Sequence, residues 1–308
     1  MSIVQYLDRG ALRNPDGDCL VSETGQSMSF TDVRKLSCRI ANRLLACGLE
    51  RDEVGSVLSF NDATAFTCPF GLSRAGMTWL PSNPRNSEDD THYLLDFMDC
   101  RVLFFSSDFA DLVNRLRPRL PNMKQWVCID QDLDTPLGPV PSQENWIDGT
   151  PETDPDLRPN PDSVAALFPT GGTTGRSKGV MMTNRVINNL VGVYAASFVY
   201  DQVEMPVNMA AAPMTHTAGL ISLSCLSRGG KVIILSKPDP ELMIDTIERE
   251  RVTEFFLPPT VIYRMLEFPG VEQRDFTSLR YFVYAAAPMA VAKLKRAIKV
   301  FGPVMTQT

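Results

Sequence analysis

The sequence predicts an α/β protein with two α/β subdomains, each built on a mainly parallel sheet that helices cover. Three observations predict this class. Short apolar runs typical of buried strands alternate along the chain with segments of helical period. A proline-rich stretch at residues 131–162 interrupts the alternation. The length of 308 residues is also sufficient for two compact units.

The first subdomain is expected over residues 1–130. It contains a helix at residues 31–47, with Thr31 as a suitable N-cap and Gly48 just past its end. The predicted strands are 54–60, 77–81, 102–106 and 126–130, and the further predicted helices are 63–74 and 88–98. Strands and helices that alternate in this way favour a parallel sheet with both faces covered.

Residues 131–162 hold seven prolines and several acidic residues, which suit neither a helix nor a central strand. We expect a surface connection there, followed by a second α/β subdomain over residues 163–308. Its predicted strands are 165–169, 208–212, 231–235, 253–257 and 281–285, and its predicted helices are 185–198, 219–227, 240–251, 260–266 and 289–300.

The composition argues against several classes of function. A formal net charge of -6, with no run of basic residues to offset it, disfavours nucleic acid or an anionic membrane as the main partner. The seven cysteines are widely separated and lack Cys-x-x-Cys spacing, which indicates reduced thiols and a cytoplasmic protein. Neither a secretory leader nor a run of eighteen apolar residues is present, so we expect no integral membrane contact.

A segment rich in glycine and threonine follows the predicted strand at 165–169. Its glycines let backbone N–H groups approach an anion closely, and its hydroxyls and single lysine add further donors. A Walker A loop would end in Gly-Lys-Ser/Thr, which this segment does not. The sequence therefore predicts a different phosphate-binding loop at the carboxyl end of a parallel strand. The segment reads Thr170, Gly171, Gly172, Thr173, Thr174, Gly175, Arg176, Ser177, Lys178 and Gly179.

Residues 170–180 resemble the phosphate-binding signature of the adenylate-forming superfamily, which includes acyl-CoA synthetases and the adenylation domains of peptide synthetases. Two other segments support the resemblance. Pro213, His216 and Gly219 are spaced as in the family's Pro-x-x-His-x-x-Gly-Leu element, and residues 284–289 are similar to its Gly-Gly/Ala-Ala-Pro element. The resemblance implies the layered αβαβα N-terminal domain of these enzymes, incomplete and without the mobile C-terminal domain, so we expect little turnover from these 308 residues alone.

The resemblance implies that a carboxylic acid attacks the α-phosphate of magnesium-bound ATP, releases pyrophosphate and is then transferred to the thiol of CoA. Lys178 and His216 would be the catalytic residues, and His216, Gly219 and Tyr284 would line the acid pocket. No pattern for a metal site held by protein side chains is found. The expected nucleotide contacts are Thr170, Gly171, Gly172, Thr173, Thr174, Gly175, Lys178, Ala286, Ala287 and Pro288.

Several alternatives stay open at this point. The thiol acceptor could belong to a carrier protein instead of CoA, or the chain could be a non-catalytic nucleotide-binding or docking module. Taken by its neighbours alone, His216 also fits a structural role, and the Ala-Ala-Ala-Pro element also fits a tight turn. The acid, whether fatty, aryl or other, is not fixed by the sequence, and neither is a homodimer.

Overall fold

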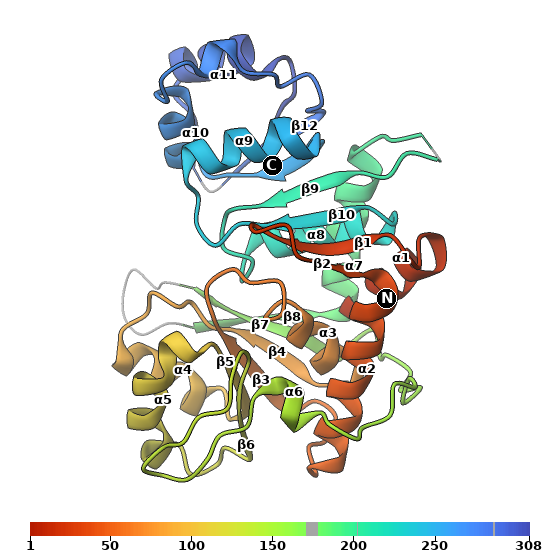
Figure 1. The fold of residues 1–308 in the computed structure, drawn as a ribbon, viewed down its shortest axis with the longest axis vertical. Coiled ribbons are helices and arrows are strands. Elements are labelled where there is room, and N and C mark those ends of the chain that lie inside the picture. The colour runs from red at the N-terminus through yellow and green to blue at the C-terminus, as the bar shows by residue number, and fades with distance from the viewer. Residues whose placement is uncertain (171–177, 202, 286) are drawn as a thin grey trace. The chain divides into compact units, whose positions relative to one another are not determined.

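The computed structural model describes residues 1–170, 178–201, 203–285 and 287–308. The chain divides into two compact units, one of Met1–Asp8 and Thr31–Leu190 and the other of Arg9–Phe30 and Val191–Thr308. Each unit is built around one sheet (Figure 1), and we call them the six-stranded unit and the seven-stranded unit after those sheets.

The six-stranded sheet has the order β6-β5-β3-β4-β7-β8, and its strands are parallel except for the antiparallel pair β7 and β8. All five residues of β3 are buried, as expected for an inner strand covered on both faces. The strands are β3 (Val54–Leu58), β4 (Thr78–Pro81), β5 (Cys100–Phe105), β6 (Gln125–Cys128), β7 (Val164–Thr170) and β8 (Lys178–Thr183).

Helices cover both faces of this sheet (Figure 1). On one face, Leu95 and Val113 pack with strand residues such as Leu103 in one apolar cluster. On the other face, an added Cβ on Gly55 of β3 would meet the side chain of Leu72. The helices are α2 (Phe30–Ala46), α3 (Thr67–Arg74), α4 (Glu88–Phe97), α5 (Ala110–Leu116) and α6 (Gln143–Trp146), with 3-10 turns at Ser107–Phe109 and Arg117–Arg119.

The seven-stranded sheet has the order β13-β12-β11-β9-β10-β1-β2 and is parallel except for the pair β1 and β2. Its core is rich in aromatic rings: the centroids of Phe255 and Phe282 are 4.1 Å apart, and those of Phe282 and Phe301 are 5.1 Å apart. The strands are β1 (Asp18–Ser22), β2 (Ser27–Ser29), β9 (Val207–Ala210), β10 (Lys231–Ile234), β11 (Glu254–Phe256), β12 (Tyr281–Tyr284) and β13 (Met305–Gln307).

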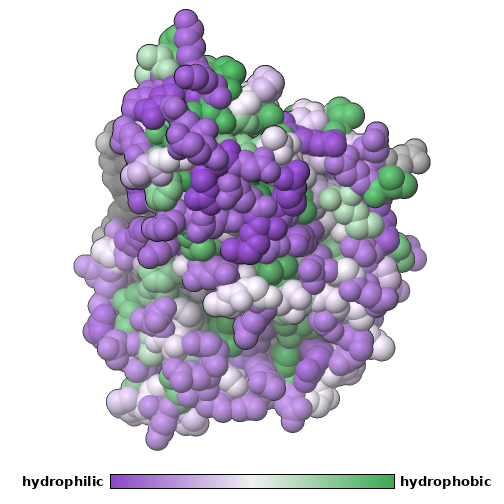
Figure 2. Space-filling view, turned by 45° about the horizontal axis from the view of Figure 1, so that its top comes forward, coloured by the Kyte–Doolittle hydropathy of each residue, from purple (hydrophilic) through white to green (hydrophobic). Residues whose placement is uncertain are grey.

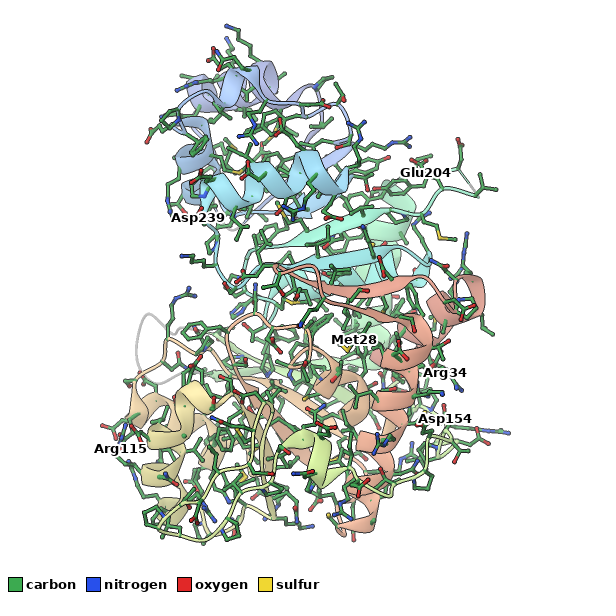
Figure 3. The ribbon with its side chains drawn as sticks, in the orientation of Figure 1. Met28, Arg34, Arg115, Asp154, Glu204 and Asp239 are labelled. Carbon is green, nitrogen blue, oxygen red and sulfur yellow. The ribbon has the colours of Figure 1, made fainter. Side chains whose placement is uncertain are left out.

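Local signals explain where the helices of this unit begin and end. Asp239, labelled in Figure 3, precedes α9. Its side chain accepts a hydrogen bond from Leu242 N at 3.2 Å, and Pro240 occupies the first helical position. The helices are α8 (Thr217–Ser227), α9 (Pro240–Glu250), α10 (Pro259–Leu266) and α11 (Val291–Phe301), with a 3-10 turn at Val271–Gln273. Two more helices, α1 (Ile3–Arg13) and α7 (Asn184–Ser197), contribute residues to both units.

The predicted fold class is confirmed, because both sheets are mainly parallel and covered by helices. The division of the chain differs from the ranges expected in the sequence. β7 and β8 complete the six-stranded sheet, although they follow the connection, and β1 and β2 join the seven-stranded sheet next to β10. These pairings join segments far apart in the sequence, and local periodicity carries no information about such partners.

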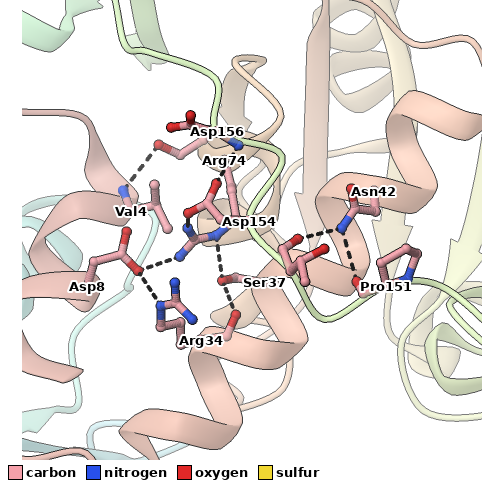
Figure 4. Close-up of polar contacts among 11 residues, drawn as sticks. Val4, Asp8, Arg34, Ser37, Asn42, Arg74, Pro151, Asp154 and Asp156 are labelled. Carbon is pink, nitrogen blue, oxygen red and sulfur yellow. Dashed lines mark hydrogen bonds and ion pairs between the residues drawn. The ribbon is translucent and has the colours of Figure 1, made fainter. Parts of the chain in front are cut away.

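The connection at residues 131–162 is held against helices of its own unit by a buried cation. Arg74, at the end of α3, has a side chain only 2% exposed and forms ion pairs with Asp8 of α1 and Asp154 of the connection (Figure 4). Its Nε also donates to Ser37 Oγ of α2 at 3.0 Å. Asn42 Nδ2 adds a hydrogen bond to the Pro151 carbonyl at 3.0 Å. Contrary to expectation, the connection holds one short helix, α6 at Gln143–Trp146. In the rest of the connection, these contacts take the place of regular secondary structure.

Hydrophilic residues predominate on the face drawn in Figure 2. Apolar side chains are also exposed on β8, where Val180 and Met181 face solvent, and on α7. The exposed apolar residues of α7 recur at helical spacing, because Val186, Leu190 and Val193 are four and three positions apart.

Candidate active site

The predicted phosphate loop connects two hydrogen-bonded strands. Thr170 is the last residue of β7 and Lys178 is the first of β8, and the two are direct partners in the antiparallel ladder. Thr170 Oγ1 donates to the Lys178 carbonyl at 3.3 Å. Both residues are exposed. The ladder therefore fixes both ends of the segment, at the carboxyl end of a strand whose neighbour β4 runs parallel to it.

Among the predicted phosphate contacts, Gly171, Gly172, Thr173, Thr174 and Gly175 lie outside the described residues. Gly179 follows the loop, and a Cβ added there would lie 2.5 Å from Cε of Met98. A side chain at this position would displace Met98, so the glycine allows the strand to pass close to the end of α4.

His216 lies at the N-cap position of α8, in the connection that follows β9. Its Nδ1 is 2.9 Å from the Thr215 hydroxyl oxygen. Protein atoms around the ring lower the pKa of His216 by desolvation, although the residue keeps an exposed surface. The lowered pKa favours the neutral imidazole, which can donate one hydrogen bond while it accepts another.

Gly219 lies in the first turn of α8 and is buried. A Cβ at this position would lie 2.2 Å from the backbone oxygen of Met214, which is too close for any other residue without a shift of the main chain. The glycine thus allows the connection that carries His216 to fold tightly over the first turn of the helix.

The third predicted element follows β12. Tyr284 ends that strand and is buried, and its hydroxyl donates to Gln307 Oε1 at 3.0 Å. Ala287 and Pro288 are exposed, whereas Ala286 lies outside the described residues. The Tyr284 hydroxyl is thus directed to β13, a contact that the sequence analysis did not foresee because it did not assign a strand to Met305–Gln307.

The second and third elements lie at the same edge of one sheet. β11 pairs in parallel with β9 on one side and with β12 on the other. The residues that follow β9 and β12, which include His216 and Ala287, therefore lie at the carboxyl edge of the seven-stranded sheet. Open parallel sheets bind their ligands at this edge. Thr170 and Lys178 have the equivalent position in the six-stranded unit.

A buried polar network connects α8 with the strands below it. Ser222 Oγ of α8 donates to Asn208 Oδ1 of β9 at 3.2 Å, and Asn208 Nδ2 is 3.4 Å from Glu254 Oε1 of β11. The Tyr200 hydroxyl donates to Glu254 Oε2 at 2.8 Å. Burial raises the pKa of Glu254 to about 7. The network fixes α8 relative to the sheet with directional contacts, in addition to apolar packing.

Two residues that sequence reasoning missed lie at the carboxyl ends of β3 and β4. The guanidinium carbon of Arg85 is 6.0 Å from the ring centroid of Phe60, and the Phe109 ring is 5.5 Å from that ring. Phe60 keeps 40% of its surface exposed. The sequence offered only position as a signal: Phe60 ends the predicted strand at 54–60, and Arg85 follows the predicted strand at 77–81.

Comparison with known proteins shows the family to which the chain belongs. The family model described as AMP-binding enzyme matches residues 7–308. A feruloyl-CoA synthase of Amycolatopsis sp is 28% identical over 272 residues, which cover 87% of this chain and 51% of the relative. The fatty acid–[acyl-carrier-protein] ligase ScoC of Streptomyces coeruleorubidus is 25% identical, over 97% of this chain and 56% of the relative. The chain thus spans about half the length of these curated relatives.

Solved structures agree on the fold. The anthranilate CoA ligase AuaEII, crystallised with anthranoyl-AMP, superposes with a TM-score of 0.90 at 21% identity, over 99% of this chain and 59% of the ligase. Within the described part of the chain, no helix combines the length and the apolar character needed to cross a membrane.

Proposed function

Because the chain belongs to the family of AMP-binding enzymes, we propose that it activates a carboxylic acid with ATP for transfer to a thiol, as an acyl-CoA synthetase does. The observation that carries this proposal is the hairpin of β7 and β8, whose paired ends Thr170 and Lys178 enclose the glycine- and threonine-rich segment. Its position at the carboxyl end of a parallel sheet suits an anionic ligand. Since the chain spans about half the length of the relatives, we propose the complete reaction for the family and a part in it for these 308 residues.

In the first step, a carboxylate oxygen attacks the α-phosphorus of ATP, which enters as its magnesium complex, and the bond to pyrophosphate breaks. We assign the ammonium group of Lys178 to the β- and γ-phosphates, where it offsets the charge of the leaving pyrophosphate. Backbone N–H groups of Gly171, Gly172 and Gly175 and the hydroxyls of Thr170, Thr173 and Thr174 would hold the same phosphates.

We assign to His216 a hydrogen bond to the carboxylate of the acid as it approaches ATP. A carboxylate that nears the α-phosphate meets repulsion between two anions, and a hydrogen-bond donor at the boundary lowers that barrier. If the Thr215 hydroxyl donates to Nδ1, the proton of the neutral imidazole lies on Nε2 and can be donated to the carboxylate. Gly219 and Tyr284 would complete the acid pocket, and the main chain at Ala286, Ala287 and Pro288 would face the adenine.

In the second step, a thiolate attacks the acyl carbonyl of the adenylate, the bond to the AMP oxygen breaks, and a thioester forms. AMP leaves far more readily than an oxide ion would leave a carboxylate. We propose CoA as the acceptor, and the relative that acylates a carrier protein supports a carrier thiol as the second candidate.

The proposal is tested by titration of the 308-residue chain with magnesium-ATP in a calorimeter, followed by pyrophosphate release with a panel of fatty and aryl acids. Lys178→Ala should weaken ATP binding or turnover on the order of a hundredfold, and Lys178→Arg should retain part of it. Lys237→Ala, at an exposed lysine on the other unit, is the matched control. Equal ATP affinity and rate in wild type and Lys178→Ala would refute the role of Lys178.

A further inference from the structure

Helix α11 separates buried and exposed residues along its length. Ala297 and Phe301 are buried in the core of the seven-stranded unit, and Leu294 packs against the same core. The opposite side of the helix exposes Val291 and Ile298, with Lys295 between them in space. Lys299 continues this outer face one turn beyond Lys295 and is also exposed. The outer face is therefore basic along its middle and apolar along one border.

The basic residues of α11 fall into two groups. Lys293 pairs with Glu267 at 2.9 Å, and Arg296 lies 3.9 Å from Glu272. Across the described residues, no carboxylate lies within ion-pair distance of Lys295 or Lys299. The two exposed lysines thus have no ion-pair partner among the described residues, in a position open to solvent.

This charge is unusual for the chain as a whole. Residues 276–308 hold five lysines and arginines and no aspartate or glutamate, whereas the chain holds 30 basic and 36 acidic residues. In the sequence, apolar residues such as Leu294 and Ile298 interrupt this basic cluster. The helical period brings its charged side chains to one side of α11. An acidic protein that displays a local basic face is suited to attract an acidic partner there.

Helix α11, which carries this basic face, begins close to the candidate active site. α11 begins shortly after Ala287 and Pro288, which follow the carboxyl end of β12. The helix therefore starts at the same edge of the seven-stranded sheet that carries His216. A partner that lies along α11 has one end next to the edge where the acyl-adenylate would form.

We propose that the outer face of α11 docks an acidic helix of a carrier protein, which delivers the acceptor thiol to the acyl-adenylate. This inference rests on the proposed activation of the acid and takes the second candidate acceptor, a carrier-protein thiol, for the transfer step. An 11-residue helix is about 16 Å long, so it matches one partner helix with acidic residues spaced one turn apart. Lys295 and Lys299 would pair with those carboxylates, and Val291 and Ile298 would contact apolar residues beside them.

An anionic membrane is the competing occupant of a basic helix. Helices that lie in a membrane interface insert large side chains such as Trp, Phe or Leu. The outer face of α11 offers only Val291 and Ile298, both short and β-branched, and Phe301 and Leu294 are turned to the core. The apolar area exposed on α11 is therefore suited to a side-by-side contact with a second helix more than to insertion into lipid.

The test measures binding of the 308-residue chain to a purified acyl carrier protein of net negative charge, in its phosphopantetheine-bearing form, by biolayer interferometry at low salt and at physiological salt. The key variant is the double reversal Lys295→Glu/Lys299→Glu. Its matched control is Arg9→Glu/Lys237→Glu, which changes the net charge equally at two exposed positions of the same unit. Circular dichroism verifies that both variants are folded.

We expect the wild type to bind the carrier more weakly as salt rises, the reversal on α11 to lose at least about tenfold in affinity, and the control to retain the wild-type value. Absence of wild-type binding at low salt, equal losses in both double variants, or binding to phosphatidylglycerol vesicles without binding to the carrier would each overturn the proposal. ATP binding by the same samples separates the two hypotheses: carrier binding without ATP binding contradicts the proposed function and leaves the docking face supported.

Discussion

Replacement of Arg74 by methionine should destabilise the six-stranded unit strongly, because this side chain joins three helices and the connection from a buried position. Its guanidinium contacts Asp8, Ser37 and Asp154, and the side chain is 2% exposed. Methionine keeps much of the packing and removes every polar contact. Removal of one partner of a buried ion pair typically costs about 3–5 kcal/mol. Since Asp8 and Asp154 are partly exposed and can regain water, we expect the lower end, roughly 3 kcal/mol.

Urea unfolding followed by tryptophan fluorescence measures this loss. All three tryptophans, Trp79, Trp126 and Trp146, belong to the six-stranded unit, so the signal reports on the unit that holds Arg74. The control is Lys35→Met, which removes an exposed pair with Glu152 at 3.3 Å and should cost less than about 1 kcal/mol. If Arg74→Met and Lys35→Met shift the unfolding midpoint equally, burial of the Arg74 cluster contributes nothing beyond a surface pair and the reasoning fails.

Three further predictions concern the seven-stranded unit. Burial raises the pKa of Glu254 to about 7, above its unfolded value, so the stability linked to this carboxyl is fully present below the unfolded pKa and is lost as the pH rises through 7. The free energy of unfolding of Glu254→Gln minus that of the wild type should therefore rise by roughly 3 kcal/mol between acidic and alkaline pH. Denaturant titrations that give the same difference at every pH would contradict this. Gly219→Ala should cost about 1–3 kcal/mol, because the added methyl meets the backbone oxygen of Met214, and an unchanged thermal midpoint by circular dichroism would show that the connection relaxes freely. Asp239→Ala should cost about 1 kcal/mol through loss of the α9 cap, whereas Asp239→Asn should retain most of it; equal unfolding midpoints for the alanine variant and the wild type would argue against the cap.

The sequence was sufficient for the fold class and for most of the helices and inner strands, because buried parallel strands such as β3 and amphipathic helices such as α9 have clear local patterns. It was insufficient for the division of the chain. β1 pairs with β10, more than 200 residues later, and short strands such as β13 have too few residues to show a period. The strand β8 was missed because it directly follows the glycine-rich segment, whose turn signals dominated the local pattern.

The candidate site shows the same limits. Motif spacing pointed to Thr170, Lys178, His216 and Ala287, and in the structure each of these four lies at the carboxyl edge of a mainly parallel sheet. Spacing could not indicate that the Tyr284 hydroxyl contacts Gln307, or that Arg85 lies over the Phe60 ring. Both contacts depend on which strands become neighbours. The basic face of α11 was also missed, because a count of consecutive charges ignores the helical period.

The strand β8 is the last strand of its sheet within the described residues, and its outer backbone groups are not paired there with another strand. The backbone at such an edge, beside the exposed Met181 side chain, is a template on which a second extended chain can add. Lys178 at the start of the strand is the charged residue that opposes such growth.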